Sequence, residues 1–446
     1  MSIQQSSGQY IDRLVDLTRP EDNHIYNMSV EEARERVNSG DPARVREIDG
    51  SFGLVARDGK RIRMARSIDR PLRYFIAKRQ DGPTLVVADR ISVIHDFLLE
   101  EGLAAQFHPS YTRMTPAHYI QELLLLGCPD PSPTQVRFFT PQRDALPADL
   151  DAIAARYVGT VADEIAKWLL SIPSDEPVGV PFSGGIDSGS VFLLTYHVML
   201  KLGMNPSRLK AFTLSLGDGP DLDQARAFLE RLDLSLFLEP IEVKPEQIDV
   251  AEAVRVLEDY KPLDVQCGAM ALALCQGIRE RYPRWKYLID GDGGDENLKD
   301  YPIEENPELT VRSVLNNLML YQEGWGVESI KHSLTYSGGQ SRGYVRTYAP
   351  LRRWGFIGLS PYTLPNVIEQ AEGIPFIALT GYDVPKLYAL KGDIVSRGVL
   401  GITGTEMPVF EKRRFQHGAA APATFSSRFP AEEREYRRLF QSIYAA

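Results

Sequence analysis

The stretch from Pro177 to Ser190 constrains the fold more than any other part of the chain. Residues 177–182 form an apolar run that predicts a strand, Ser183-Gly-Gly-Ile-Asp-Ser188 predicts a tight turn, and the apolar run from Val191 predicts a helix. Two adjacent glycines let the backbone approach a ligand closely, and the N–H groups that begin a helix attract anions. This strand, turn and helix therefore predict a phosphate-binding loop in an α/β fold.

The composition of the loop indicates which phosphate it binds. No lysine follows the glycines, as one does in the G-x-x-x-x-G-K-[ST] loop that holds a transferring γ-phosphoryl group. Small hydroxyls, backbone amides and the carboxylate of Asp187 suit pyrophosphate with Mg²⁺, so we expect ATP to be cleaved between its α- and β-phosphates. The alternative is a Ser/Gly-rich turn that only caps a helix.

A second glycine-containing loop, Asp290-Gly-Asp-Gly-Gly-Asp-Glu296, directly follows a predicted strand over residues 285–290. Loops that follow parallel strands gather at one edge of an open α/β sheet, so this acidic loop is expected to face the first loop and bracket ATP with it. Its carboxylates suit Mg²⁺, and one of them is a candidate base toward an incoming amine. The alternatives are a solvated acidic turn and a Ca²⁺-type loop.

The order of predicted elements indicates two domains. From residue 150 to residue 290, predicted helices and strands alternate, which is typical of a doubly wound parallel sheet, and past Asn306 the pattern becomes mostly helical. Residues 49–93 instead contain short apolar stretches separated by turn residues, which predict a smaller β-rich module. A Pro-containing stretch over residues 141–147 predicts a linker, so the expected domains are residues 1–145 and 146–446.

Composition excludes several classes of protein. The 446 residues carry a formal net charge of −10, which argues against a broad nucleic-acid interface. Three scattered cysteines do not make a disulfide framework or a Cys/His metal site. No apolar run approaches the roughly 18 residues that span a bilayer, so we expect a cytoplasmic protein without membrane contact.

The two loops, about a hundred residues apart, together resemble the synthetase domain of the asparagine synthetase family within the ATP pyrophosphatases. The intervening segments Phe212-Thr-Leu-Ser215 and Pro220-Asp-Leu-Asp-Gln-Ala-Arg226 are similar to the family's segment around adenine and the helix behind it. Near the carboxyl end, Glu411-Lys-Arg-Arg-Phe-Gln-His-Gly418 resembles the family's lysine segment. The resemblance implies the cofactors ATP and Mg²⁺.

The resemblance also implies site residues. Those expected to bind the nucleotide, with its pyrophosphate and Mg²⁺, are Ser183, Gly184, Gly185, Asp187, Ser188, Leu214 and Gly291. Asp187 and Asp295 are the expected metal ligands, and Asp292 falls where the family places an acidic residue beside the reacting centre.

Two lysines near the carboxyl end are candidates for the family's cations. Lys412 is the expected catalytic cation, because a mobile ammonium suits charge that develops on the α-phosphate or the tetrahedral intermediate. The alternative for Lys412 is a basic surface run. Lys391, in Ala-Leu-Lys-Gly-Asp-Ile394, is a candidate for another family lysine.

The amino-terminal module resembles the second half of the family's glutaminase domain. Ile48-Asp-Gly-Ser-Phe-Gly53 and Ala65-Arg-Ser-Ile-Asp-Arg-Pro-Leu72 carry this resemblance, which implies a truncated Ntn-type module. A working glutaminase of this kind needs a cysteine after the initiator methionine as nucleophile, and here Ser2 stands at that position. We therefore expect no glutamine hydrolysis.

The expected function is that of an AMP-forming ligase. It would adenylate a small-molecule or peptide carboxylate and join it to a substrate amine, as β-lactam synthetases and lasso-peptide cyclases do, with a role in specialised-metabolite or peptide biosynthesis. The alternatives are ammonia-dependent amidation, a tRNA-modifying enzyme of the same nucleotide-binding class, and a non-catalytic scaffold. The amino-terminal module is a candidate face for a homodimer.

Overall fold

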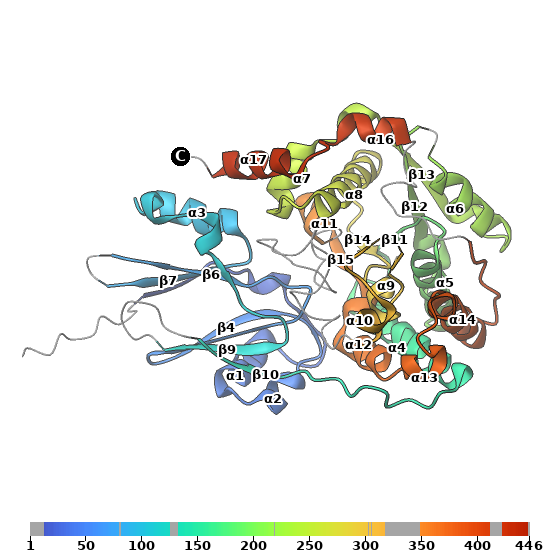
Figure 1. Cartoon of the computed structure of the whole chain (residues 1–446), viewed down its shortest axis with the longest axis horizontal. Helices are drawn as coiled ribbons and strands as arrows, with labels where there is room; N and C mark the ends of the chain where they lie inside the picture. Colours follow the sequence, from blue (N-terminus) through green and yellow to red (C-terminus); the bar gives the residue numbers. More distant parts are fainter. Residues whose placement is uncertain are drawn as a thin grey trace, which may run out of the picture. The chain divides into compact units, whose positions relative to one another are not determined.

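The computed structural model describes residues 13–79, 82–124, 133–217, 219–301, 303–304, 306–316, 348–410 and 422–444. The chain divides into two compact units, one formed by residues 1–140 with 442–446 and the other by residues 141–441 (Figure 1). The predicted linker over residues 141–147 begins at the first residue of the second unit, where Leu146 N donates to Gly373 O and Asp144 N donates to Glu372 O.

The first unit is built from two four-stranded sheets with strand orders β1-β7-β6-β8 and β10-β9-β5-β4, and from a short pair, β2-β3. The strands are β1 Arg13–Asp16, β2 His24–Ile25, β3 Gly50–Ser51, β4 Gly53–Asp58, β5 Arg61–Arg66, β6 Arg73–Ala77, β7 Thr84–Ala88, β8 Arg113–Met114, β9 Tyr119–Leu124 and β10 Thr134–Arg137. Met64 of one sheet and Val87 of the other belong to the same buried cluster, so the sheets pack face to face.

Helices cover both outer sides of this sandwich. They are α1 Val30–Ser39, α2 Pro42–Arg46 and α3 Ile91–Glu100. Ile94 and Leu98 of α3 pack on Phe75 and Val86, on the other face of the β6–β7 sheet, whereas α1 contacts β4 and β5. The expected β-rich module is therefore present, with three helices that the strand pattern alone did not predict.

The second unit contains one sheet of five strands, in the order β13-β12-β11-β14-β15, and all its neighbours are parallel. The strands are β11 Val178–Pro181, β12 Leu209–Ser215, β13 Leu238–Glu242, β14 Tyr287–Ile289 and β15 Ile357–Leu359. The strand order reverses between β11 and β14, which pair directly through Val178 and Tyr287. In open α/β sheets this reversal marks the ligand-binding crevice.

Helices surround this sheet, and they continue beyond it to the end of the described chain. They are α4 Leu150–Ser171, α5 Ile186–Lys201, α6 Asp221–Glu230, α7 Val250–Leu257, α8 Pro262–Arg281, α9 Gly294–Asn297, α10 Val311–Leu315, α11 Ala349–Arg353, α12 Pro365–Glu372, α13 Phe376–Thr380, α14 Val384–Thr403, α16 Pro422–Arg428 and α17 Glu433–Ile443. The predicted α/β fold with a doubly wound parallel sheet is confirmed.

Alternate strand residues face different helix layers. Ala211 belongs to the buried cluster that includes residues of α4, α5 and α14. Ile241 of β13 lies three residues beyond Leu238, the register partner of Ala211, and instead packs against Gly277 of α8. Because successive side chains of a strand point to opposite faces, both faces of the sheet are covered, as expected for a parallel sheet.

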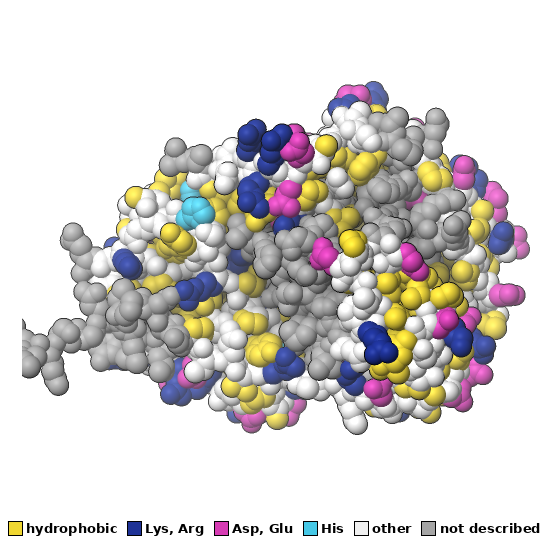
Figure 2. Space-filling view, viewed as in Figure 1, with side chains coloured by type: hydrophobic (Ala, Val, Ile, Leu, Met, Phe, Trp, Pro, Cys, Tyr) yellow, Lys and Arg dark blue, Asp and Glu magenta, His cyan; other side chains and the backbone are white. Residues whose placement is uncertain are grey.

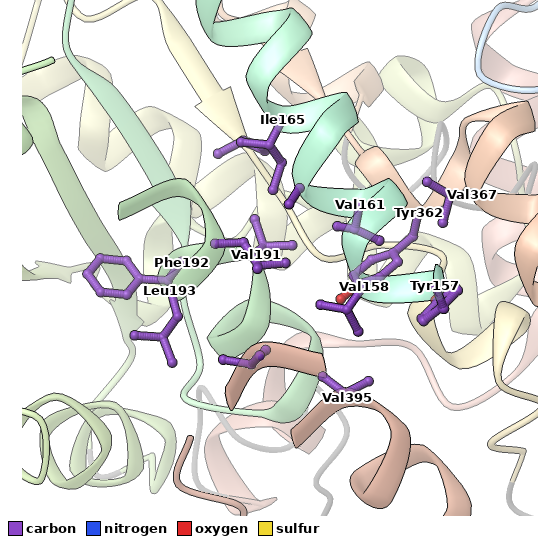
Figure 3. Close-up of a cluster of buried hydrophobic side chains, with 14 of the residues drawn as sticks. Tyr157, Val158, Val161, Ile165, Val191, Phe192, Leu193, Tyr362, Val367 and Val395 are labelled. Carbon is purple, nitrogen blue, oxygen red and sulfur yellow. The ribbon is translucent and has the colours of Figure 1, made fainter. Parts of the chain in front are cut away.

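The helix α4 shows how the sequence builds one of these layers. The side chain of Asp149 accepts hydrogen bonds from the N–H groups of Asp151 and Ala152 and so caps the helix. Its residues at helical spacing are buried beside α5, α14 and Tyr362, and those labelled in Figure 3 are Tyr157, Val158, Val161 and Ile165. This apolar layer supports the helix that begins at the phosphate-binding loop.

Candidate active site

The phosphate-binding loop follows β11 and is organised by its own hydrogen bonds. Ser183 Oγ accepts from Gly185 N at 3.3 Å and lies 3.3 Å from Ser188 Oγ. Gln224 of α6 donates to Ser183 O at 3.1 Å, which ties the loop to the neighbouring helix. Gly184 has φ 72°, and a side chain there would also press on the backbone of Ala225.

The helix α5 begins directly at this loop. Gly185 is its N-cap and no side chain caps it. The first N–H groups of a helix have no partners within the helix and attract anions. Asp187 lies in the first turn of α5, so a phosphate at this helix end would lie close to its carboxylate.

The acidic loop follows β14 and reaches α5. A Cβ atom on Gly291 would lie 2.9 Å from Ser188 N, and one on Gly294 would lie 2.2 Å from Asp187 Oδ1. A side chain at position 291 would press on the backbone of Asp187 and Ser188, and one at position 294 would displace the carboxylate of Asp187. The predicted meeting of the two loops is confirmed, because β11 and β14 are neighbours and both loops leave the same edge of the sheet.

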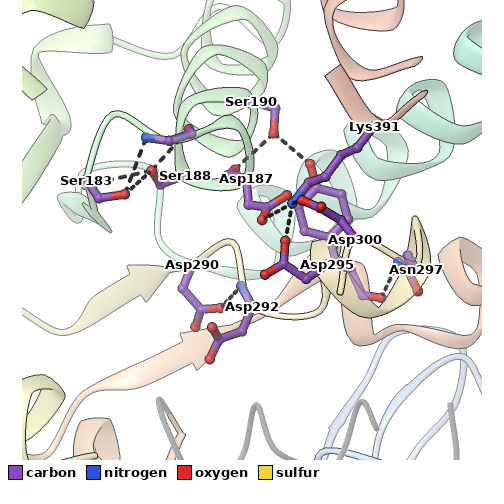
Figure 4. Close-up of polar contacts among 12 residues, drawn as sticks. Ser183, Asp187, Ser188, Ser190, Asp290, Asp292, Asp295, Asn297, Asp300 and Lys391 are labelled. Atoms are coloured by element: carbon purple, nitrogen blue, oxygen red, sulfur yellow. Dashed lines mark hydrogen bonds and ion pairs between the residues drawn. The ribbon is translucent and has the colours of Figure 1, made fainter. Parts of the chain in front are cut away.

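A buried lysine joins the two loops. Lys391 of α14 donates to Asp187 Oδ2 at 2.6 Å and also to Asp295 Oδ1, and its ammonium lies 3.5 Å from Asp300 Oδ2 (Figure 4). Burial lowers the pKa of Lys391, but the negative charges of Asp187, Asp295 and Asp300 outweigh this effect and raise it well above its ordinary value. Lys391 is therefore a charged ammonium held among three carboxylates.

Behind this cluster lies a network of hydroxyl groups. Ser190 Oγ donates to Asp187 O at 2.9 Å and lies 2.7 Å from Tyr362 Oη. The ring of Tyr362 stacks on that of Tyr157 with centroids 6.0 Å apart, and Asn297 bonds to both tyrosines. Burial raises the pKa of Tyr362, and the charge of Asp187 adds to the effect, so its hydroxyl is neutral.

Asp292 belongs to the acidic loop but not to the lysine cluster. Its N–H donates to Asp290 Oδ1 at 2.9 Å, and Ser360 Oγ donates to the same oxygen at 2.7 Å. Figure 4 shows the side chain of Asp292 beside Asp290 and apart from Lys391. The role of Asp292 beside the reacting centre stays a prediction.

The two remaining predicted site residues are Leu214 and Lys412. Leu214 lies in β12, is buried, and is paired in register with Ile241 of β13. Lys412 lies outside the described residues, so its prediction stays as it was. The site thus brings together the predicted residues of both loops, which are Ser183, Gly184, Gly185, Asp187, Ser188, Gly291 and Asp295.

The residues present fit Mg²⁺. Asp187 and Asp295 converge on one cation, the ammonium of Lys391, and Mg²⁺ is usually held by one or two carboxylates together with substrate phosphates. Among the described residues, no three His, Cys, Asp or Glu side chains are grouped closely enough to hold a metal ion. Asp187 and Asp295 therefore stay the predicted metal ligands.

The sequence contained a signal for Lys391 beyond its resemblance to a family lysine. It lies at helical spacing from Leu387 and Val395, which are both buried, so a lysine occupies the apolar side of α14. Long charged side chains are seldom fully buried without a partner. No comparable local signal marks Ser190, Asp300 or Tyr362 as part of the site.

Comparison with known proteins agrees with this geometry. Residues 171–353 match the family model for asparagine synthase, and this range contains both loops. The chain therefore contains an asparagine synthase domain, and its predicted relationship to the asparagine synthetase family is confirmed. A search of curated proteins found no match.

The molecular surface and helices add two observations. Acidic and basic side chains are interspersed over the described surface on the face shown in Figure 2, and neither sign covers it continuously. Within the described ranges, no helix combines the length and the apolar character that crossing a membrane requires.

Proposed function

We propose that this protein is an ATP-dependent, AMP-forming ligase that adenylates a substrate carboxylate and joins it to a substrate amine. The observation that carries the proposal is the meeting of the phosphate-binding loop with Asp295 and Lys391 at the reversal point of a parallel sheet. The match to asparagine synthase supports an ATP-dependent ligase that forms C–N bonds.

In the proposed reaction, a carboxylate oxygen attacks the α-phosphorus of ATP and pyrophosphate leaves. The N–H groups at the start of α5 and the hydroxyls of Ser183 and Ser188 bind the phosphates. Asp187 and Asp295 would hold Mg²⁺, which when bound neutralises the charge of the leaving pyrophosphate. The amine then attacks the acyl carbon, its nitrogen loses a proton, and AMP leaves.

The nitrogen is proposed to come from an amine and not from glutamine. Glutamine hydrolysis in this family requires a cysteine directly after the initiator methionine as its nucleophile, and Ser2 stands at that position. The single cysteine of residues 1–140 is Cys128. The cysteines of the second unit, Cys267 and Cys275, are buried in α8, and burial raises the pKa of the Cys275 thiol. A specialised metabolite or peptide is the proposed class of substrate.

Isotope exchange between pyrophosphate and ATP in the presence of candidate carboxylates tests adenylation directly. Asp187→Asn should lower the exchange rate by about 100-fold, because it removes a charge at the reacting phosphates. Asp163→Asn, an exposed position on α4, is the matched control and should exchange at the wild-type rate. Equal rates for Asp187→Asn and wild type would contradict the proposal.

A second assay identifies the nitrogen source. Product formation is measured with ammonium as the only nitrogen donor and compared with a panel of primary amines. Turnover with an amine but not with ammonium supports the proposal, whereas turnover with ammonium alone supports the amidation alternative.

A further inference from the structure

Lys391 occupies the place that the preceding arguments give to a metal ion. Its ammonium contacts Asp187 from α5 and Asp295 from α9, two carboxylates that belong to different loops. Lys391 therefore bridges the two expected metal ligands. The inference that follows rests on the proposed function.

Exposure distinguishes the two sides of the carboxylate pair. The side chain of Lys391 is 3% exposed, so it reaches the pair from the protein interior. The side chains of Asp187 and Asp295 are 24% and 37% exposed. A metal ion can therefore reach the same carboxylates from solvent while the lysine holds them from inside.

Charge determines what happens when both cations are present. An ammonium and a divalent cation repel each other strongly at short distance in a partly buried site. The metal can bind Asp187 and Asp295 only if the ammonium of Lys391 moves away from them. Asp300 provides a third carboxylate, whose Oδ2 lies 3.5 Å from the ammonium and whose side chain is 12% exposed. Lys391 thus has a second partner within the same cluster.

We propose that Lys391 is a positioning residue that holds Asp187 and Asp295 in their metal-binding arrangement before nucleotide arrives, and that it moves to Asp300 when the metal enters. Because displacement of the ammonium opposes the binding of a bare ion, the metal enters with its nucleotide. The phosphates supply both additional ligands for the metal and negative charge for the displaced lysine.

Binding of Mn²⁺, followed by electron paramagnetic resonance of the free ion, tests this without any turnover. In the absence of nucleotide, Lys391→Met should bind Mn²⁺ at least about ten-fold more tightly than wild type, which corresponds to removal of one opposing charge. Lys386→Met, an exposed lysine on the same helix, should bind Mn²⁺ as wild type does. Structural damage would not tighten metal binding, so a gain of affinity is specific to the proposed role.

A second variant keeps the test decisive if Lys391→Met does not fold. Asp300→Asn retains both contacts to Asp187 and Asp295 but removes the charge of the second partner. Its affinity for Mn²⁺ with a nonhydrolysable ATP analogue should fall several-fold, while its affinity for Mn²⁺ alone should not rise.

Two outcomes would overturn the proposal. One is equal affinity of wild type and Lys391→Met for Mn²⁺ alone, and the other is an unchanged affinity of Asp300→Asn for Mn²⁺ with the analogue. Failure of the proposed ligase activity would be seen separately, because the comparison with Mn²⁺ alone involves no carboxylate substrate, no amine substrate and no ATP–pyrophosphate exchange.

Discussion

The backbone of Gly294 lies so close to Asp187 that a Cβ atom at position 294 would be 2.2 Å from the carboxylate oxygen Oδ1. Glycine is therefore a requirement of the site and not merely of a turn.

Gly294→Ala should lower the rate of ATP–pyrophosphate exchange by about 100-fold, because the added methyl group displaces the carboxylate of Asp187, and small misplacements of reacting groups have effects of this size. The measurement is the exchange rate at saturating ATP. Gly401→Ala is the control, since a Cβ at position 401 of α14 meets nothing within 4 Å. It should exchange normally and gain about 0.5–1 kcal/mol in unfolding free energy. A wild-type rate of ATP–pyrophosphate exchange for Gly294→Ala would show that exchange does not depend on the present position of the Asp187 carboxylate.

Tyr362→Phe should lower the free energy of unfolding by about 1 kcal/mol, because it removes the buried hydrogen bond between Tyr362 and Ser190. Urea denaturation measures this change. Tyr196→Phe is the control on α5, since the hydroxyl of Tyr196 has no hydrogen-bond partner among the described residues. Its stability should stay within about 0.5 kcal/mol of wild type. The prediction is wrong if both variants are equally stable.

Ser360→Ala should destabilise the acidic loop. Asp290 is 4% exposed and its Oδ1 accepts from Ser360 Oγ at 2.7 Å, so loss of this donor should cost about 1.5–3 kcal/mol in unfolding free energy. Urea denaturation again gives the value, and exposed Ser207→Ala should match wild type. A loss no larger than that of the control would mean that water replaces the hydroxyl.

The first unit should lose stability in mild acid because of His118. Burial, followed by the charges of Arg66, Arg46 and Arg137, lowers the pKa of His118 to about 3 from an ordinary value of 6.5. As the pH falls below 6.5, the unfolded chain binds a proton at this position and the folded chain does not. The free energy of unfolding should therefore fall by about 1.4 kcal/mol per pH unit until the pH approaches 3.

His118→Asn tests the source of this pH dependence. His118 has φ 64°, and asparagine tolerates this conformation better than most residues. Urea denaturation of the whole chain at several pH values should show a flatter pH dependence of the unfolding free energy for His118→Asn than for wild type. Identical slopes for wild type and His118→Asn would assign the pH dependence to other groups.

The sequence predicted the meeting of the two loops because this follows from general rules. The carboxyl ends of parallel strands lie at one edge of the sheet, so the loops after β11 and β14 were expected at the same edge. That these two strands are neighbours is known only from the structure. The approach of Lys391 to Asp187 was not predictable in this way. It depends on how α14 packs on α5, a contact between side chains 204 positions apart.

The sequence analysis also missed secondary-structure elements that are short or are marked only by a local sequence pattern. The strand β15 has three residues, too few to show an alternating pattern. The helix α8 begins at Pro262, and proline is favoured in the first turn of a helix. The helix α1 was identifiable, since Ser29 and Glu32 form a capping box and that pattern occurs in the sequence.

The distance along the chain between Asp187 and Lys391 also bears on how the protein is made. A nascent chain that has left the ribosome as far as Leu359 contains both loops and every strand of the second unit, but not the lysine that joins the loops. Two sets of carboxylates would then lie close together without their counter-charge. The cluster of Asp187, Asp295 and Asp300 is therefore completed only when Lys391 has emerged.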